Sequence, residues 1–151
     1  MASNEEVIST LNGLVETCRD GQDGFQTAAG AVGSAELKQL FHGYSQQRAQ
    51  FVGELQEEVR RLGGDPENSG SVAASLHRGW MGLKSAITGR DDGAILAECE
   101  RGEDSAVANY RAALGTDLPA HVRAVVERQF SEVKQAHDRV RSLEKAGGAN
   151  A

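Results

Sequence analysis

Hydrophobic residues recur three and four positions apart along nearly the whole chain. This spacing places them on one face of an α-helix, because a helix completes a turn every 3.6 residues. No segment shows the strict alternation of apolar and polar residues that is typical of a half-buried strand. The pattern therefore predicts an all-α protein with four long helices and one short one, over residues 4–32, 35–62, 72–88, 92–114 and 119–145.

Local signals support the ends of these helices. Ser3 followed by Glu6 has the spacing of a capping box, in which both side chains bond to free N–H groups at a helix start. Gly33 can end the first helix, and the segment GGDP at 63–66 stops the second. Pro119 suits the first turn of the last helix, where a missing N–H costs little.

The lengths of the connections predict how the helices are arranged. Short connections join the first long helix to the second and the third to the fourth, so each pair should form an antiparallel hairpin. A long connection, which carries the short helix over 72–88, joins the two hairpins. This arrangement is typical of a ferritin-like four-helix bundle rather than of a simple up-down bundle. We expect one domain over residues 1–151, because a chain of this length can bury a sizeable core.

Charge and composition exclude several classes of protein. The net charge is −6 and the basic residues are dispersed, whereas a nucleic-acid binder needs clustered Lys and Arg to neutralise phosphates. No apolar run approaches the ~20 residues of a membrane span, and the N-terminus lacks a secretory apolar segment. Cys18 and Cys99 match no disulfide framework or CxxC motif. We therefore expect a cytoplasmic protein with reduced thiols that binds neither nucleic acid nor membrane.

Each long helix also places polar side chains on its apolar face, near its middle. Arg48 lies between apolar positions of the second helix, and Glu103 and His137 interrupt the stripes of the third and fourth. Folding each hairpin about its turn brings these positions to similar heights. An unpaired buried polar group costs roughly 1–3 kcal/mol, so we expect these groups to bond to one another. The predicted buried network consists of Gln22, Tyr44, Arg48, Glu103, Gln129 and His137.

The alternative interpretation of these residues is a metal centre. Ferritin-like di-iron sites take one Glu from each of two helices and a Glu-x-x-His pair from each of the other two. No Glu-x-x-His pair occurs in the sequence, which favours a structural network without a cofactor. Glu100 and Glu103 do have a spacing that lets them share a helix face. The candidate ligands for iron or manganese are therefore an atypical set, namely Glu100, Glu103, Glu132 and His137.

Four segments carry a resemblance to a known family: STLNGLVETCRDGQDGF, EVRRLGGDPENSGSVAASLHRGW, ECERGED and VKQAHDRV. Over about residues 4–143 the chain resembles a bacterial family of ferritin-like four-helix-bundle proteins known as a domain of unknown function. The resemblance implies that fold and a bacterial cytoplasmic origin, and it brings no established reaction or substrate. Related ferritin-like families bind iron or manganese, but their Glu-x-x-His ligands have no counterpart in this chain.

Two hypotheses of function follow from these observations. The first is a non-catalytic helical protein with a structural or protein-interaction role, associated with stress, that acts as a homodimer or with another protein partner. The second is a metal-binding oxidoreductase that uses the atypical ligand set. A third hypothesis, a small-ligand sensor, would require a cavity between the helices.

Overall fold

The computed structural model describes residues 3–66, 80, 83–88 and 91–150. No strand occurs within these ranges, and the all-α prediction is confirmed. The predicted short helix is described only in its last part, because residues 67–79, 81–82 and 89–90 lie outside the described residues. The helices are α1 (Asn4–Ala31), α2 (Ala35–Arg61), α3 (Leu83–Thr88), α4 (Asp92–Leu114) and α5 (Ala120–Asn150).

The long helices begin at residues whose side chains bond to the free backbone N–H groups of a first turn. Ser3 and Glu6 form the capping box at the start of α1, where the Glu6 amide donates to the Ser3 hydroxyl at 3.2 Å. Ser34 caps α2 and Asp91 caps α4 in the same way. The last helix is longer than the sequence predicts, since α5 continues to Asn150 instead of ending at residue 145.

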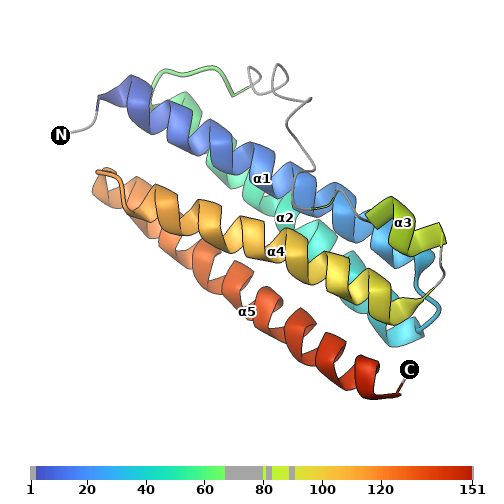
Figure 1. Ribbon diagram of the computed structural model, residues 1–151. Coiled ribbons are helices and arrows are strands. Elements are labelled where there is room, and N and C mark those ends of the chain that lie inside the picture. Colours follow the sequence, from blue (N-terminus) through green and yellow to red (C-terminus); the bar gives the residue numbers. More distant parts are fainter. Residues whose placement is uncertain (1–2, 67–79, 81–82, 89–90, 151) are drawn as a thin grey trace.

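The four long helices lie side by side in a bundle of two hairpins (Figure 1). In this bundle α1 packs against α2 and α4, while α5 packs against α4 and α2. Consequently α2 and α4 occupy opposite corners. A long connection joins the end of α2 to α4, and its short helix α3 packs against α4 and α1. This is the arrangement that the connection lengths predict.

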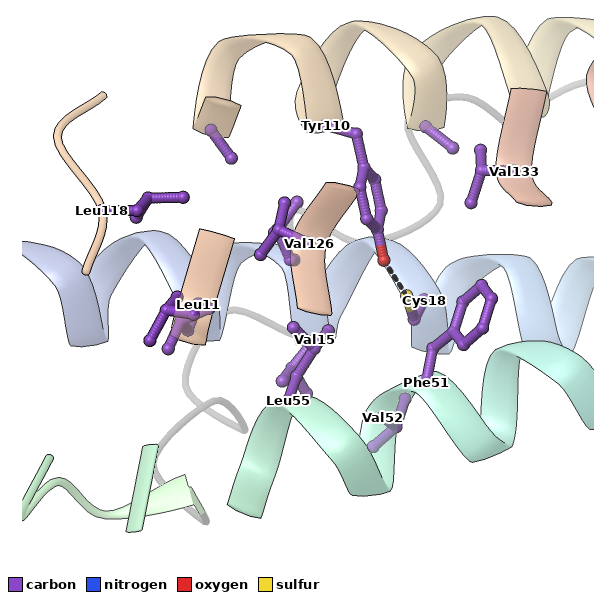
Figure 2. Close-up of a cluster of buried hydrophobic side chains, with 14 of the residues drawn as sticks. Leu11, Val15, Cys18, Phe51, Val52, Leu55, Tyr110, Leu118, Val126 and Val133 are labelled. Carbon is purple, nitrogen blue, oxygen red and sulfur yellow. Dashed lines mark hydrogen bonds between the residues drawn. The ribbon is translucent and has the colours of Figure 1, made fainter. Parts of the chain in front are cut away.

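The core of the bundle consists of two clusters of buried apolar side chains. One gathers around Leu11, Leu55 and Tyr110, with side chains converging from all four long helices (Figure 2). The other gathers around Phe25, Phe41 and Ile95 and includes Trp80 from the crossover. Each helix therefore turns one apolar face inward and leaves the other polar. None of the described helices has both the length and the apolar character that a membrane crossing needs.

Candidate functional site

A buried ion pair lies at the centre of the bundle. The Arg48 guanidinium of α2 donates two hydrogen bonds to the Glu103 carboxylate of α4, from Nη1 to Oε2 at 3.0 Å and from Nη2 to Oε1 at 2.5 Å. Their side chains are 1% and 0% exposed. Two parallel charge-assisted bonds are the strongest geometry for such a pair. Because α2 and α4 occupy opposite corners, the pair crosses the whole bundle.

The positions of these two residues along their helices separate the two apolar clusters. On α2, Arg48 lies between Phe41 of one cluster and Phe51 of the other. On α4, Glu103 lies between Cys99 and Ala106 in the same way. The ion pair therefore forms a charged layer across an otherwise apolar core.

The surroundings of Arg48 make room for its charge and compensate it. A Cβ atom at Gly21 would lie 3.0 Å from Nη1, so the missing side chain lets the guanidinium approach α1. The guanidinium also lies over the Phe25 ring, with 5.5 Å between Cζ and the ring centroid. Burial alone would lower the pKa of Arg48, but the charge and hydrogen bonds of Glu103 raise it above its ordinary value. Arg48 is thus a permanent cation.

A second set of polar side chains, linked by hydrogen bonds, lies beside this pair. The Tyr110 hydroxyl donates to Oε1 of Gln129 at 2.7 Å, and the Cys18 sulfur lies 3.1 Å from the same hydroxyl (Figure 2). Because the hydroxyl proton is committed to Gln129, the Cys18 thiol donates to Tyr110. Gln129 Nε2 in turn donates to Glu54 at 2.9 Å. Each of these groups has a defined donor or acceptor role, which orders one rotamer of each.

Burial makes the Cys18 thiol unreactive. It raises the pKa of Cys18 to about 11, and the nearby Arg48 charge offsets that effect only in part. Burial likewise raises the pKa of Tyr110 well above its usual value. A cysteine acts as a nucleophile through its thiolate, which this environment suppresses at neutral pH. These hydrogen-bonded side chains therefore order the core and supply no activated nucleophile.

A third polar group lies on the outer side of the α4–α5 contact. His137 has Nε2 at 2.6 Å from Asp104 Oδ1 and Nδ1 at 3.0 Å from Asp138 Oδ1. Burial alone would lower the pKa of His137, but hydrogen bonds to Asp138 and Asp104 raise it above its ordinary value. Glu100 completes the group, because one donor atom each from Glu100, Asp104 and His137 lie within 4.8 Å of one another.

The six residues of the predicted network therefore fall into separate groups. Arg48 bonds to Glu103, whereas Gln129 bonds to Tyr110 and His137 bonds to Asp104. The Tyr44 ring is half-buried and packs on Phe25, with 5.2 Å between the ring centroids. Gln22 contributes its backbone carbonyl, which accepts a hydrogen bond from Ser45 at 2.9 Å.

The four candidate metal ligands do not come together. Glu103 pairs with Arg48, and Glu132 accepts a hydrogen bond from Arg128 at 3.2 Å. Only Glu100 and His137 share a cluster, and its third member is Asp104, which is not among the four predicted ligands. The missed signal is the spacing of four between Glu100 and Asp104, which places both carboxylates on one face of α4.

The residues at the centre of the bundle do not fit the dimetal centre that the ferritin-like arrangement implies. Such a centre needs several carboxylates and imidazoles directed inward from all four helices. Among the described residues the buried carboxylates are Glu58 and Glu103. Glu103 has both oxygens on a guanidinium, and Glu58 lies against His121 at 2.8 Å, away from the central pair. A permanent cation already occupies the place where a metal would bind.

The fold defines the class of protein: two helical hairpins joined by a long crossover form a ferritin-like four-helix bundle. A similar solved structure is a two-domain protein from Anabaena variabilis that contains DJ-1/ThiJ/PfpI-like and ferritin-like domains. It has a TM-score of 0.80 and 16% sequence identity, over 96% of this chain and 40% of that one. The chain thus spans less than half the length of that protein, and the likeness shows the fold.

Residues 6–116 match the family described as Domain of unknown function (DUF2383), and the chain belongs to that family. The match covers α2, α3, α4 and all but the first residues of α1, and therefore includes both Arg48 and Glu103. A comparison with the curated proteins finds no match.

Proposed function

We propose that the protein is a non-catalytic ferritin-like bundle that acts by binding a protein chain, either a second copy of itself or another partner. The observation that carries this proposal is the bidentate pair of Arg48 and Glu103 at the centre of the bundle. In an enzyme of this architecture, redox chemistry takes place on metal ions held at the centre. Here the central carboxylate is neutralised by the chain's own guanidinium.

Electrostatics explains why a metal ion would not displace this pair. A divalent cation near Glu103 would meet the positive charge of Arg48 in a core of low dielectric, where repulsion between like charges is strong. Arg48 cannot relieve the repulsion by losing its proton, because Glu103 raises its pKa further. Removing its side chain from the core would also leave Glu103 buried without a partner.

The proposed setting is the bacterial cytoplasm. Cys18 and Cys99 are both free and buried thiols. Buried thiols that form no disulfide suit a reducing compartment. The proposed partner mode is a homodimer, the commonest closed assembly of soluble chains, or a complex with another protein.

The first experiment tests for catalysis. The purified protein is mixed with ferrous iron in air, and oxygen consumption is compared between the wild type and Glu103→Gln. We expect neither protein to consume oxygen faster than buffer containing the same iron. Catalytic oxygen consumption that is lost in Glu103→Gln would overturn the proposal.

The second experiment tests for the interaction role. Sedimentation equilibrium over a range of protein concentrations measures the mass of the assembly, and affinity capture from bacterial extract tests for a partner. A defined dimer, or one partner protein bound in stoichiometric amount, supports the proposal. A chain that stays monomeric and retains no partner in stoichiometric amount would contradict it.

A further inference from the structure

The outer cluster of Glu100, Asp104 and His137 combines two kinds of metal donor from two helices. Glu100 and Asp104 lie one turn apart on α4, and His137 faces them from α5. One donor atom from each lies within 4.8 Å of the others. Ligands at about 2.0–2.2 Å from one ion lie some 3–3.5 Å apart, so small side-chain rotations would bring these atoms into a coordination sphere.

The position of His137 gives a second, separate reason to expect a cation. Its two ring nitrogens both face carboxylate oxygens, Asp138 at Nδ1 and Asp104 at Nε2. A neutral imidazole carries one proton, so one of its lone pairs would point at a carboxylate across 2.6 or 3.0 Å. A second positive charge between the nitrogen and the carboxylate removes that repulsion. The charge can be a proton or a metal ion.

The contact with Asp138 also favours a metal at Nε2. Metal-binding imidazoles commonly donate the N–H that does not face the metal to a carboxylate, which fixes the ring and makes the ligating nitrogen more basic. With Nδ1–H donated to Asp138, the Nε2 lone pair is directed at Asp104. His137 is 9% exposed, so its ring is held in place by the packing of the two helices.

Access and local charge are compatible with an ion from solution. The side chains of Glu100 and Asp104 are 24% and 62% exposed, so an ion can enter from solvent and retain water in its remaining positions. Two cations compete for the same carboxylates: Arg141 lies 4.0 Å from Glu100, and Lys134 lies 3.1 Å from Asp138. Glu100, Asp104 and Asp138 carry three negative charges against these two positive ones, so the site remains negative when the imidazole is neutral.

We propose that Glu100, Asp104 and His137 form a site for one divalent transition cation, with Zn²⁺ the best fit. One imidazole and two carboxylates suit Zn²⁺, which binds such ligands tetrahedrally with water in the fourth position. The site lies on the outer side of the α4–α5 contact and is separate from the central ion pair. It is independent of the proposed non-catalytic role, because a bound Zn²⁺ would join two helices without redox chemistry.

The test is calorimetric titration of the untagged, chelator-treated and dialysed protein with ZnCl₂ at pH 7.5. We expect one equivalent to bind with a micromolar or tighter dissociation constant. His137→Gln and Asp104→Asn should each weaken binding at least 10-fold, and Asp138→Asn should weaken it about 10-fold through the lost orientation of the ring. The matched control is His121→Gln, which removes another imidazole of α5 that pairs with a carboxylate, Glu58 of α2, and it should bind as the wild type does.

Two outcomes would overturn the site. One is the absence of stoichiometric binding, which would mean that a proton alone supplies the charge at His137. The other is binding that survives both His137→Gln and Asp104→Asn. If His137→Gln does not fold, Asp104→Asn still decides the question, because it alters an exposed side chain. Replacement of Zn²⁺ by Co²⁺ gives an independent readout, since its visible absorption should change in Asp104→Asn.

Discussion

Arg48 and Glu103 are each costly to bury alone, and their pairing is what makes the charged layer stable. Arg48→Met should lower the free energy of unfolding by ~3–5 kcal/mol, because it leaves the Glu103 carboxylate buried without its partner. The double variant Arg48→Met/Glu103→Leu should lose much less than the sum of the two single variants, since it leaves no buried charge. Urea denaturation of all four proteins measures this coupling.

The exposed pair of Arg60 and Glu57 is the control for this cycle. It has an N–O distance of 3.2 Å, but both side chains are 55% exposed. Arg60→Met should therefore change the free energy of unfolding by no more than about 0.5 kcal/mol. Additive losses for Arg48→Met and Glu103→Leu would show that the two charges do not depend on each other.

Cys18 makes the free energy of unfolding fall as the pH becomes alkaline. Its pKa is about 11 in the folded protein and 9.0 when unperturbed, so the folded state holds the proton more tightly. The stabilisation is complete below pH 9 and is lost as pH rises toward 11, at roughly 1.4 kcal/mol per pH unit. Cys18→Ser cannot ionise in this range, so its free energy of unfolding should fall less between pH 8 and 10.5. Equal losses in the two proteins, by urea denaturation, would contradict the cause.

At the scale of the helices, the close contact of α1 with α4 depends on two glycines that face Trp80. A Cβ atom would lie 2.2 Å from the Trp80 ring at Gly102 and 2.4 Å from it at Gly24. The ring also packs edge-on against Phe25, with the centroids 5.1 Å apart. The glycines therefore form a slot between two helices, and the indole of the crossover fills it.

Gly102→Ala should displace Trp80 and lower the free energy of unfolding by ~1–3 kcal/mol. Gly13→Ala is the matched control, because nothing lies within 4 Å of an added Cβ there, and helix propensity should make it stabilising by up to about 1 kcal/mol. Thermal melts compare the two variants. Trp80 is the chain's single tryptophan, so its fluorescence should shift to longer wavelength in Gly102→Ala. An unshifted spectrum with a stabilised protein would exclude the contact.

The elements could be predicted from the sequence because their ends depend on local chemistry. Ser3, Ser34 and Asp91 bond to backbone groups within three residues of themselves, so spacing alone reveals them. The end of α5 is the exception to this rule. The Gly-Gly pair at 147–148 has low helix propensity and predicts a stop, yet the helix continues to Asn150.

The partners of the polar residues could be predicted only in part, because they depend on how the helices meet. Helical phase turns Arg48 and Glu103 inward, but their contact requires α2 and α4 to occupy opposite corners of the bundle. His137 lies on the inward stripe of α5, yet its ring bonds to Asp104 at the outer edge of α4. Asp104 is 62% exposed, and its spacing of four from Glu100 does not by itself distinguish it from a solvated acid.

At the scale of the whole molecule, one side chain links the two hairpins at the end of the bundle where α1 turns into α2. Asp92, the first residue of α4, accepts hydrogen bonds from the amides of Gly33 at 2.9 Å and Ser34 at 3.1 Å. Those amides belong to the turn between α1 and α2, which lies beside the start of α4 (Figure 1). At this end of the bundle the two hairpins are thus joined by two charge-assisted bonds.

Asp92→Ala should break this link, lower the free energy of unfolding by ~1–2 kcal/mol and speed hydrogen exchange of the Gly33 and Ser34 amides. Asp91→Ala is the matched control, because the Asp91 carboxylate accepts a hydrogen bond at 2.9 Å from the Gly93 amide in the first turn of α4. It should cost a similar free energy and speed exchange at Gly93, while the turn amides remain protected. Site-resolved exchange therefore separates a link between hairpins from the loss of a helix cap. Unchanged exchange at Gly33 and Ser34 in Asp92→Ala would mean that Asp92 does not hold the turn against the start of α4.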